Sequence, residues 1–297
     1  MTPLKYRWAH GVNSYALLAD VQRQIKEAQQ HQFAVPNFVN AIEADIIWSE
    51  DQEIPVMGHP PAITGDLTFS HFLSVMLDLA LTLKSLNFNF KTPLIVKCDF
   101  KSSRAFEMSL EMLIKFMTLY PYSKGIFINA DILPGPANSD YVAFDASTFL
   151  NQVYHLSEYE GGKHRDKLVL SVGWTTANNN EEEIHREYSL EMVHEMLRAL
   201  QPLGDNIVVT FPIRATSVRK SWPALRLLLE SKNYGLTLWW TKTQISDEEL
   251  EWIFSTLENE QDKSCIDAQP TYAGRTFYDI KGFDNFLAKR SSSNAQL

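Results

Sequence analysis

Charged side chains interrupt two otherwise apolar, β-rich segments of the chain. Segment 41–48 contains Glu43 and Asp45, and segment 94–100 with the residue after it contains Lys97, Asp99 and Lys101. Alternate residues of a strand point to the same face. Each set of charges therefore shares one face of its strand, and the apolar residues between them share the other.

Three carboxylates that meet at one end of a sheet repel one another unless a cation joins them. Glu43, Asp45 and Asp99 therefore predict a divalent metal site. Because oxygen ligands suit hard cations, Mg²⁺ is the expected metal, with Ca²⁺ and Mn²⁺ as alternatives. A solvated charge at a strand end is the structural alternative. It fits Glu43 and Asp45 poorly, because carboxylates inside an apolar strand need partners.

Two histidines, His10 and His59, each end a β-rich run and precede turn-forming residues, whereas the other six fall in expected helices or loops. Imidazole titrates near neutral pH, so both positions suit proton transfer. Further strand ends supply candidate substrate contacts, namely Asn13, Asn129, Asp131, Arg214 and Trp240. Structural roles are the alternatives for three of them: a turn or cap for Asn13, a rim ion pair for Arg214, and core packing for Trp240.

Short β-rich runs alternate with helical patterns along the chain. The runs cover residues 7–12, 41–48, 94–100, 125–132, 167–174, 206–213, 236–240 and 276–280, and a further run at 54–59 is expected to pair with the second as a hairpin. Helices are predicted at 14–30, 68–85, 103–119, 145–156, 189–200, 217–231 and 246–257.

This alternation favours parallel strands with right-handed crossovers. Eight such strands predict a single α/β domain over residues 1–290, a (β/α)₈ barrel of the TIM type, followed by a flexible tail at 291–297. Catalytic side chains then belong at the carboxyl ends of the strands. An open, doubly wound sheet is the alternative. It commonly carries a Gly-rich loop after its first strand, and residues 9–14 contain one glycine.

Composition and charge limit the binding partners and the cellular compartment that we expect for this protein. The 297 residues are 45% hydrophobic and carry a formal net charge of −9, so we expect a globular protein that does not bind double-stranded DNA. Its two cysteines, Cys98 and Cys265, fit neither a disulfide scaffold nor a zinc finger. Residues 1–12 lack an apolar run, and no run approaches the roughly 18 residues of a membrane span. We therefore expect no signal peptide and no membrane span, and a cytoplasmic protein.

A series of short motifs, in order along the chain, resembles the menorin family. The motifs are Trp8-Ala9-His10-x-Val12-Asn13-Ser14, Ile42-Glu43-Ala44-Asp45, Gly58-His59-Pro60-Pro61, Asp99-Phe100-Lys101, Asn129-Ala130-Asp131-Ile132-Leu133-x-Gly135-Pro136, Gly173-Trp174-Thr175-Thr176, Thr210-Phe211-Pro212-x-Arg214-Ala215 and Leu236-Thr237-Leu238-Trp239. The resemblance covers about residues 7–281, and the expected lack of an anchor points to the short, cytosolic branch of that family.

That family in turn resembles the phospholipase C-like phosphodiesterase barrels, which include glycerophosphodiester phosphodiesterases and spider sphingomyelinase D. The resemblance implies that His10 and His59 form the acid/base pair and that Glu43, Asp45 and Asp99 bind the metal. It also implies that Lys101 faces the phosphate. The chain departs from the pattern after each histidine, with Gly-Val-Asn after His10 and Pro-Pro after His59.

The sequence thus favours a metal-dependent phosphodiesterase that acts on a lipid headgroup, a glycerophosphodiester or an RNA-type phosphodiester. Attack by water and internal attack by a neighbouring hydroxyl both remain open. The alternative is a catalytically silent barrel that binds a ligand or a protein. A sugar-active barrel fits less well, because Glu43 and Asp45 lie side by side on one strand and cannot readily flank a glycosidic bond.

Overall fold

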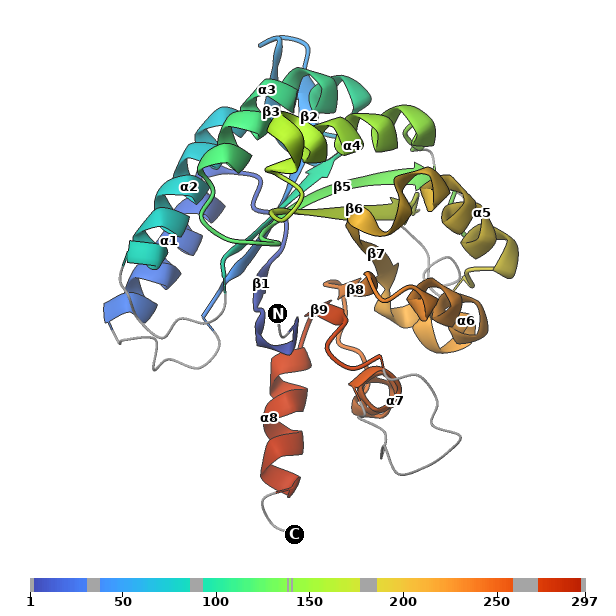
Figure 1. The fold of residues 1–297 in the computed structure, drawn as a ribbon. Coiled ribbons are helices and arrows are strands. Elements are labelled where there is room, and N and C mark those ends of the chain that lie inside the picture. Colours follow the sequence, from blue (N-terminus) through green and yellow to red (C-terminus); the bar gives the residue numbers. More distant parts are fainter. Residues whose placement is uncertain are drawn as a thin grey trace.

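The computed structural model describes residues 3–30, 38–85, 93–137, 139, 141–176, 186–258 and 272–294. Its strands pair in parallel in the order β1-β2-β4-β5-β6-β7-β8-β9 and curve into a nearly closed barrel (Figure 1), which confirms the predicted TIM-type fold. These strands are β1 (Trp8–Ala9), β2 (Ala41–Ser49), β4 (Ile95–Phe100), β5 (Ile126–Leu133), β6 (Leu168–Trp174), β7 (Val208–Arg214), β8 (Tyr234–Trp240) and β9 (Thr276–Ile280). As predicted, β3 (Ile54–Met57) forms an antiparallel hairpin with β2.

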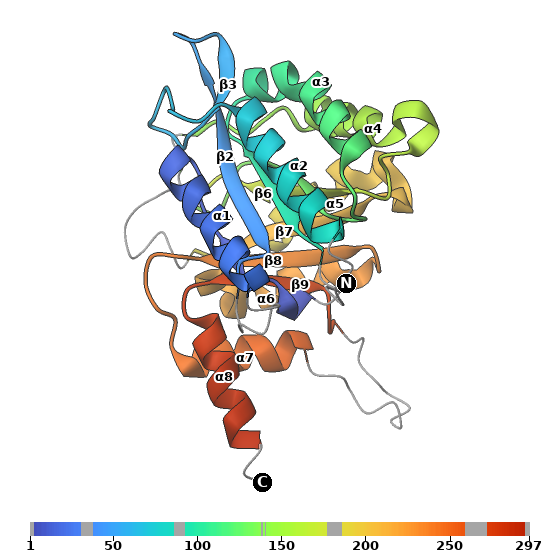
Figure 2. The ribbon, with the colours of Figure 1, turned by 90° about the vertical axis from the view of Figure 1, so that its left-hand side faces the viewer.

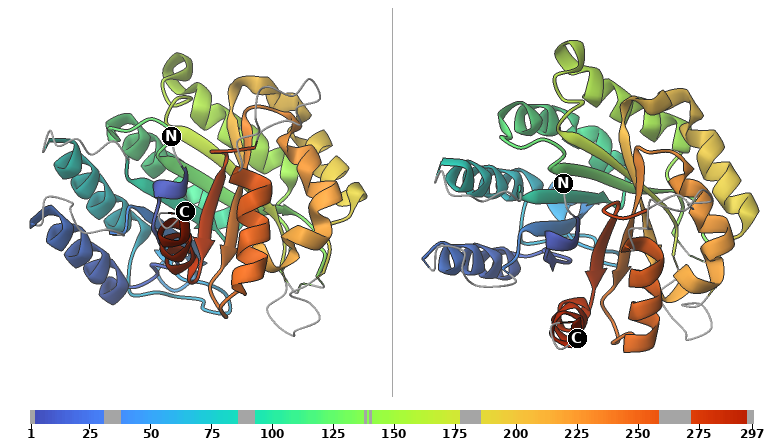
Figure 3. Two further views of the ribbon diagram at one scale, coloured as in Figure 1. Left: turned by 90° about the horizontal axis from the view of Figure 1, so that it is seen from below. Right: turned by 60° about the horizontal axis from the view of Figure 1, so that its bottom comes forward.

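Helices surround the sheet on its outer side, as Figures 2 and 3 show. They are α1 (Tyr15–Gln30), α2 (Phe69–Ser85), α3 (Ser103–Leu119), α4 (Ala146–Gly162), α5 (Leu190–Leu200), α6 (Val218–Leu225), α7 (Asp247–Glu258) and α8 (Phe283–Asn294). Among the residues described, no helix has both the length and the apolar character that crossing a bilayer requires.

Side-chain alternation divides each strand between the helical layer and the barrel interior. On β2, Ile42, Ala44 and Ile46 join the large apolar core beneath the helices. Ala41 instead joins a small interior cluster with Tyr6, Ile95, Phe127, Val169 and Phe277. The amino-terminal half of the interior is therefore apolar, and the charged residues lie above it, toward the carboxyl ends of the strands.

Strand register brings the interior polar residues to common levels. Glu43 pairs with Lys97, and Asp45 pairs with Asp99. Along β5, Asn129 lies opposite both Asp99 and Ser171. Parallel strands without a shift therefore convert residues far apart in sequence into neighbouring rows inside the barrel.

The seam of the barrel lies between β1 and β9, at the two ends of the strand order. Side chains join these edges. The Nε atom of Arg7 lies 2.6 Å from Asp284 Oδ1, the rings of Tyr6 and Phe277 pack with centroids 5.6 Å apart, and His10 reaches across to Asp279. The first and last strands of the barrel are therefore joined by side-chain contacts beside the interior polar residues.

Four expectations need correction. The first strand was predicted over 7–12 but covers Trp8–Ala9, because the chain leaves the ladder at Gly11, where φ is +65°. The helix predicted at 217–231 is broken, with α6 ending at Leu225 and a 3₁₀ segment following it at Arg226–Glu230. Helix α8 was not predicted, since its Ser-rich second half lacks an apolar stripe. It extends to Asn294, so the first four residues of the predicted tail 291–297 are helical.

Candidate active site

Three buried carboxylates form a compact cluster at the carboxyl ends of β2 and β4. One oxygen from each of Glu43, Asp45 and Asp99 lies within 4.8 Å of the other two. Each of these residues is less than 10% exposed. Three oxygen donors this close together, with their side chains directed into one cavity, fit a hard divalent cation.

The ammonium group of Lys101 lies against two of these carboxylates. Its Nζ is 2.8 Å from Asp99 Oδ2 and 3.1 Å from Asp45 Oδ1. Burial lowers the pKa of Lys101, but Asp99 and Asp45 outweigh it and raise that pKa well above its ordinary value. Burial raises the pKa of Asp99, but the charges of Lys101 and Lys97 outweigh it and bring that pKa below its ordinary value. Lys101 and Asp99 are therefore a charged pair at neutral pH.

Amide side chains fix the positions of two of the carboxylates. Asn13 donates from Nδ2 to Asp45 Oδ2 at 2.7 Å, and its Oδ1 accepts the backbone N–H of Asp45 at 2.8 Å. Asn129 donates to Asp99 Oδ1 at 2.7 Å while accepting from the Ser171 hydroxyl. These bonds hold the carboxylates in place, as supporting residues around a metal site do.

His10 sits at the seam between two acidic groups. Its Nδ1 is 2.6 Å from Asp279 Oδ2 and 3.4 Å from Glu43 Oε2, and Glu43 also accepts the backbone N–H of Gly11. Burial lowers the pKa of His10, but the Glu43 charge and the hydrogen bond to Asp279 outweigh it and raise the pKa to about 10. The imidazole is therefore protonated at neutral pH, with Nδ1 engaged by Asp279.

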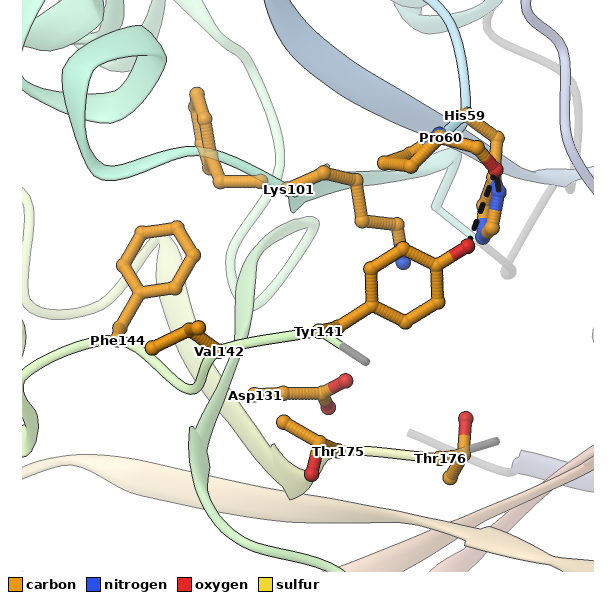
Figure 4. Close-up of a pocket in the computed structure, with 10 residues that line it drawn as sticks. His59, Pro60, Lys101, Asp131, Tyr141, Val142, Phe144, Thr175 and Thr176 are labelled. Atoms are coloured by element: carbon orange, nitrogen blue, oxygen red, sulfur yellow. Dashed lines mark hydrogen bonds between the residues drawn. The ribbon is translucent and has the colours of Figure 1, made fainter. Parts of the chain in front are cut away.

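His59 approaches the cavity from the loop after β3. Its Nδ1 lies 2.6 Å from the Pro60 carbonyl oxygen, and its ring meets Tyr141 edge-on with centroids 6.3 Å apart. The Tyr141 hydroxyl donates to the same carbonyl at 3.3 Å. Figure 4 shows this group beside Lys101. His59 is exposed, so its environment differs from that of His10.

Most of the predicted site residues line one cavity of about 180 Å³. It is lined by His10, Glu43, Asp45, His59, Lys97, Asp99, Lys101, Asn129, Asp131, Trp174, Thr176, Pro212, Trp239, Thr241 and Lys242. A smaller cavity of about 60 Å³ shares His59, Lys101, Asp131 and Thr176 with it and extends toward Tyr141 and Phe144 (Figure 4). Both histidines and all three carboxylates thus border one space with room for several water molecules.

Three of the predicted substrate contacts lie elsewhere. Trp240 packs in the core under the helices, with its indole N–H donating to Thr243, because strand parity points Trp239 rather than Trp240 into the cavity. Asn13 supports Asp45 and does not line the cavity. Arg214 is also outside the lining and places its guanidinium 5.5 Å from the centroid of the Trp239 ring.

Sequence reasoning missed Asp279 and left Lys97 and Trp239 out of the site. Asp279 is 9% exposed and holds His10 from the opposite edge of the barrel. The sequence did contain a signal for Asp279. It is a carboxylate inside the apolar run 276–280, and the same kind of position had singled out Asp45. Lys97 shares its strand face with Asp99, and its buried charge acts on His10 and Asp131.

Known proteins resemble the chain at two levels. Residues 3–264 match the Menorin N-terminal domain family. Protein FAM151B of Homo sapiens is 32% identical over 233 residues, which cover 77% of this chain and 75% of that protein. Among solved structures, a glycerophosphodiester phosphodiesterase from Thermotoga maritima aligns at 15% identity and a TM-score of 0.41, over 96% of this chain and 98% of that one. An HpcH/HpaI aldolase from Desulfitobacterium hafniense aligns at 8% identity and a TM-score of 0.45, over 99% and 94% of the two chains.

The similarity to these two solved structures is too distant to indicate a reaction for this protein. The family match and the human relative, in contrast, cover most of the sequence and agree with each other. The chain belongs to the menorin family.

Proposed function

We propose that this protein is a metal-dependent phosphodiesterase in which His10 and His59 transfer protons. The observation that carries the proposal is the cluster of Glu43, Asp45 and Asp99, whose oxygens lie within 4.8 Å of one another in the cavity that both histidines line. A silent binding barrel has no physical need for buried carboxylates that repel one another.

The carboxylate cluster would hold the cation, with Mg²⁺ as the first choice and Ca²⁺ or Mn²⁺ as alternatives. A bound cation would supply positive charge to the non-bridging oxygens of a phosphodiester. Lys101 and Lys97 line the same cavity and add positive charge of the protein's own. Together these groups would offset the charge that develops on phosphorus-bound oxygens during displacement.

His10 suits the role of general acid. Its Nδ1 is engaged by Asp279, so Nε2–H is the group left to protonate a departing oxygen. The raised pKa keeps this proton on the ring at neutral pH. His59 would then act as the base for the nucleophile, which is water or a neighbouring hydroxyl of the substrate. The proposed substrates are lipid headgroups, glycerophosphodiesters and RNA-type phosphodiesters.

A panel of these phosphodiesters, assayed with Mg²⁺, Mn²⁺, Ca²⁺ or EDTA, tests the proposal. We expect turnover that requires a divalent cation, and Asp45→Asn should lose both turnover and the metal-dependent rise in melting temperature. Asp247→Asn changes an exposed carboxylate on α7 and serves as the control. Absence of metal-dependent cleavage across the panel, with metal binding retained, would favour the silent binding barrel.

A further inference from the structure

Asp131 differs from the other interior carboxylates in its lack of hydrogen-bond donors. Glu43, Asp45, Asp99 and Asp279 each accept at least one hydrogen bond from a backbone or side-chain group. In the part of the chain that the structure describes, the Asp131 carboxylate accepts none and forms no ion pair. Asp131 is partly buried and lines the cavity, so a bound ligand can reach its carboxylate oxygens.

The neighbouring strand leaves room for this carboxylate. Gly173 lies opposite Asp131 on β6, and a Cβ atom at that position would lie 2.8 Å from Asp131 Oδ1. Asp131 lines both cavities, together with His59, Lys101 and Thr176. Figure 4 shows its carboxylate directed into the space near Tyr141 and Thr176. The unpartnered oxygens therefore face the place where a ligand would sit.

The charges around Asp131 indicate what kind of ligand group it accepts. Burial raises the pKa of Asp131 to about 7, although the charges of Lys101, Lys97 and Arg214 lower it, so this carboxyl group lies among cationic side chains and still has no hydrogen-bond partner among the described residues. The missing element is a hydrogen-bond donor. A neutral hydroxyl supplies one without adding a charge next to Lys101, whereas an ammonium group would meet the repulsion of these cations.

We propose that Asp131 is a specificity-determining residue that accepts a hydrogen bond from a hydroxyl of the substrate, carried by the alcohol moiety next to the phosphoryl group. The inference rests on the proposed function, because it takes the phosphoryl group to lie beside Lys101 and the metal-binding carboxylates. Asp131 would then favour phosphodiesters whose alcohol is a polyol, such as glycerol or ribose.

Binding of three phosphomonoesters tests the inference without turnover. Glycerol 3-phosphate, propyl phosphate and phosphoethanolamine share the phosphate. The carbon chain next to it carries hydroxyl groups in the first, hydrogen atoms alone in the second and an ammonium group in the third. With Mg²⁺ present, calorimetry should show glycerol 3-phosphate binding about 10- to 100-fold more tightly than propyl phosphate, the range for a hydrogen bond to a charged acceptor. In Asp131→Ala this ratio should fall to about one, while the affinity for propyl phosphate stays within a few-fold of wild type.

Two further variants guard against a folding artefact. Asp131→Asn keeps the shape and one acceptor oxygen, so it should retain part of the preference. Gly173→Ala leaves every polar group in place but crowds the Asp131 carboxylate, so it should reduce the ratio. Melting curves establish that each variant is folded.

The outcomes separate this inference from the proposed function. An unchanged ratio in Asp131→Ala, a preference for phosphoethanolamine that Asp131→Ala abolishes, or failure of all three esters to bind overturns the inference. If Asp131→Ala abolishes the hydroxyl preference although no phosphodiester is cleaved, the proposed function fails and the inference stands.

Discussion

Replacing Lys101 by methionine removes the ammonium group that lies between Asp45 and Asp99 and keeps an unbranched side chain of similar length. The two contacts are 2.8 and 3.1 Å long, and the Lys101 side chain is 21% exposed. At an effective dielectric constant of about 20, each contact is an attraction of roughly 5–6 kcal/mol. The desolvation of lysine cancels much of this, and removal of one partner from a buried pair typically costs about 3–5 kcal/mol.

Because Lys101 is partly exposed, we expect the low end of that range, a loss of about 3 kcal/mol in the free energy of unfolding. Urea unfolding in EDTA measures it, and the melting temperature should fall by roughly 5 °C for a chain of this size. Lys289→Met is the matched control, since its Nζ lies at the same 2.8 Å from Asp247 but both side chains are more than half exposed. An exposed pair contributes about 1 kcal/mol or less.

Added Mg²⁺ should stabilise Lys101→Met more than it stabilises the wild type, because no ammonium group then competes for the carboxylates. The reasoning is refuted if Lys101→Met unfolds at the wild-type urea concentration in EDTA. Equal Mg²⁺-induced shifts in both proteins would show that Lys101 and the cation do not share these ligands.

The remaining predictions concern the histidines and the buried thiol. The raised pKa of His10 means that the folded protein holds a proton that the unfolded chain releases, so stability in EDTA should fall as pH rises from about 6.5 to about 10. Asp279→Asn should flatten this fall, as urea unfolding at pH 6, 8 and 10 will measure, and an unaltered slope would exclude the contact as its cause. His10→Ala and His59→Ala should each reduce phosphodiester turnover by about 10²–10⁴-fold without changing the Mg²⁺-induced rise in melting temperature. Wild-type turnover in both would end the acid/base assignment. Cys98 is fully buried in the core beneath the helices and burial raises its pKa, so a thiol reagent should label it far more slowly in native than in unfolded protein. Rapid native labelling would contradict the register that points Asp99 into the barrel.

The barrel and its acidic cluster follow from patterns that span only a few residues. Strand alternation places Glu43 and Asp45 on one face, and the same rule applied to β4 directs Asp99 inward and Cys98 outward. Parallel register without a shift then brings Asp45 level with Asp99. Parity also shows why Trp240 was a wrong choice, because Trp239 is the residue that shares the inward face of β8. These properties are readable from the chain, because a period of two and a sequence of β and α segments are local.

Contacts between distant segments depended on the closed fold. His10 and Asp279 are 269 positions apart and meet at 2.6 Å, because the barrel curves until its first and last strands face each other. Burial lowers the pKa of the His10 imidazole, the charge of Glu43 on the neighbouring strand β2 raises it, and the Asp279 contact across this seam raises it further. Asp131 is an inward carboxylate by parity alone, yet its lack of donors and the space left by Gly173 depend on the neighbouring strand. Residue type and parity therefore determine which groups enter the barrel, whereas their partners and protonation depend on three-dimensional distances that no local pattern encodes.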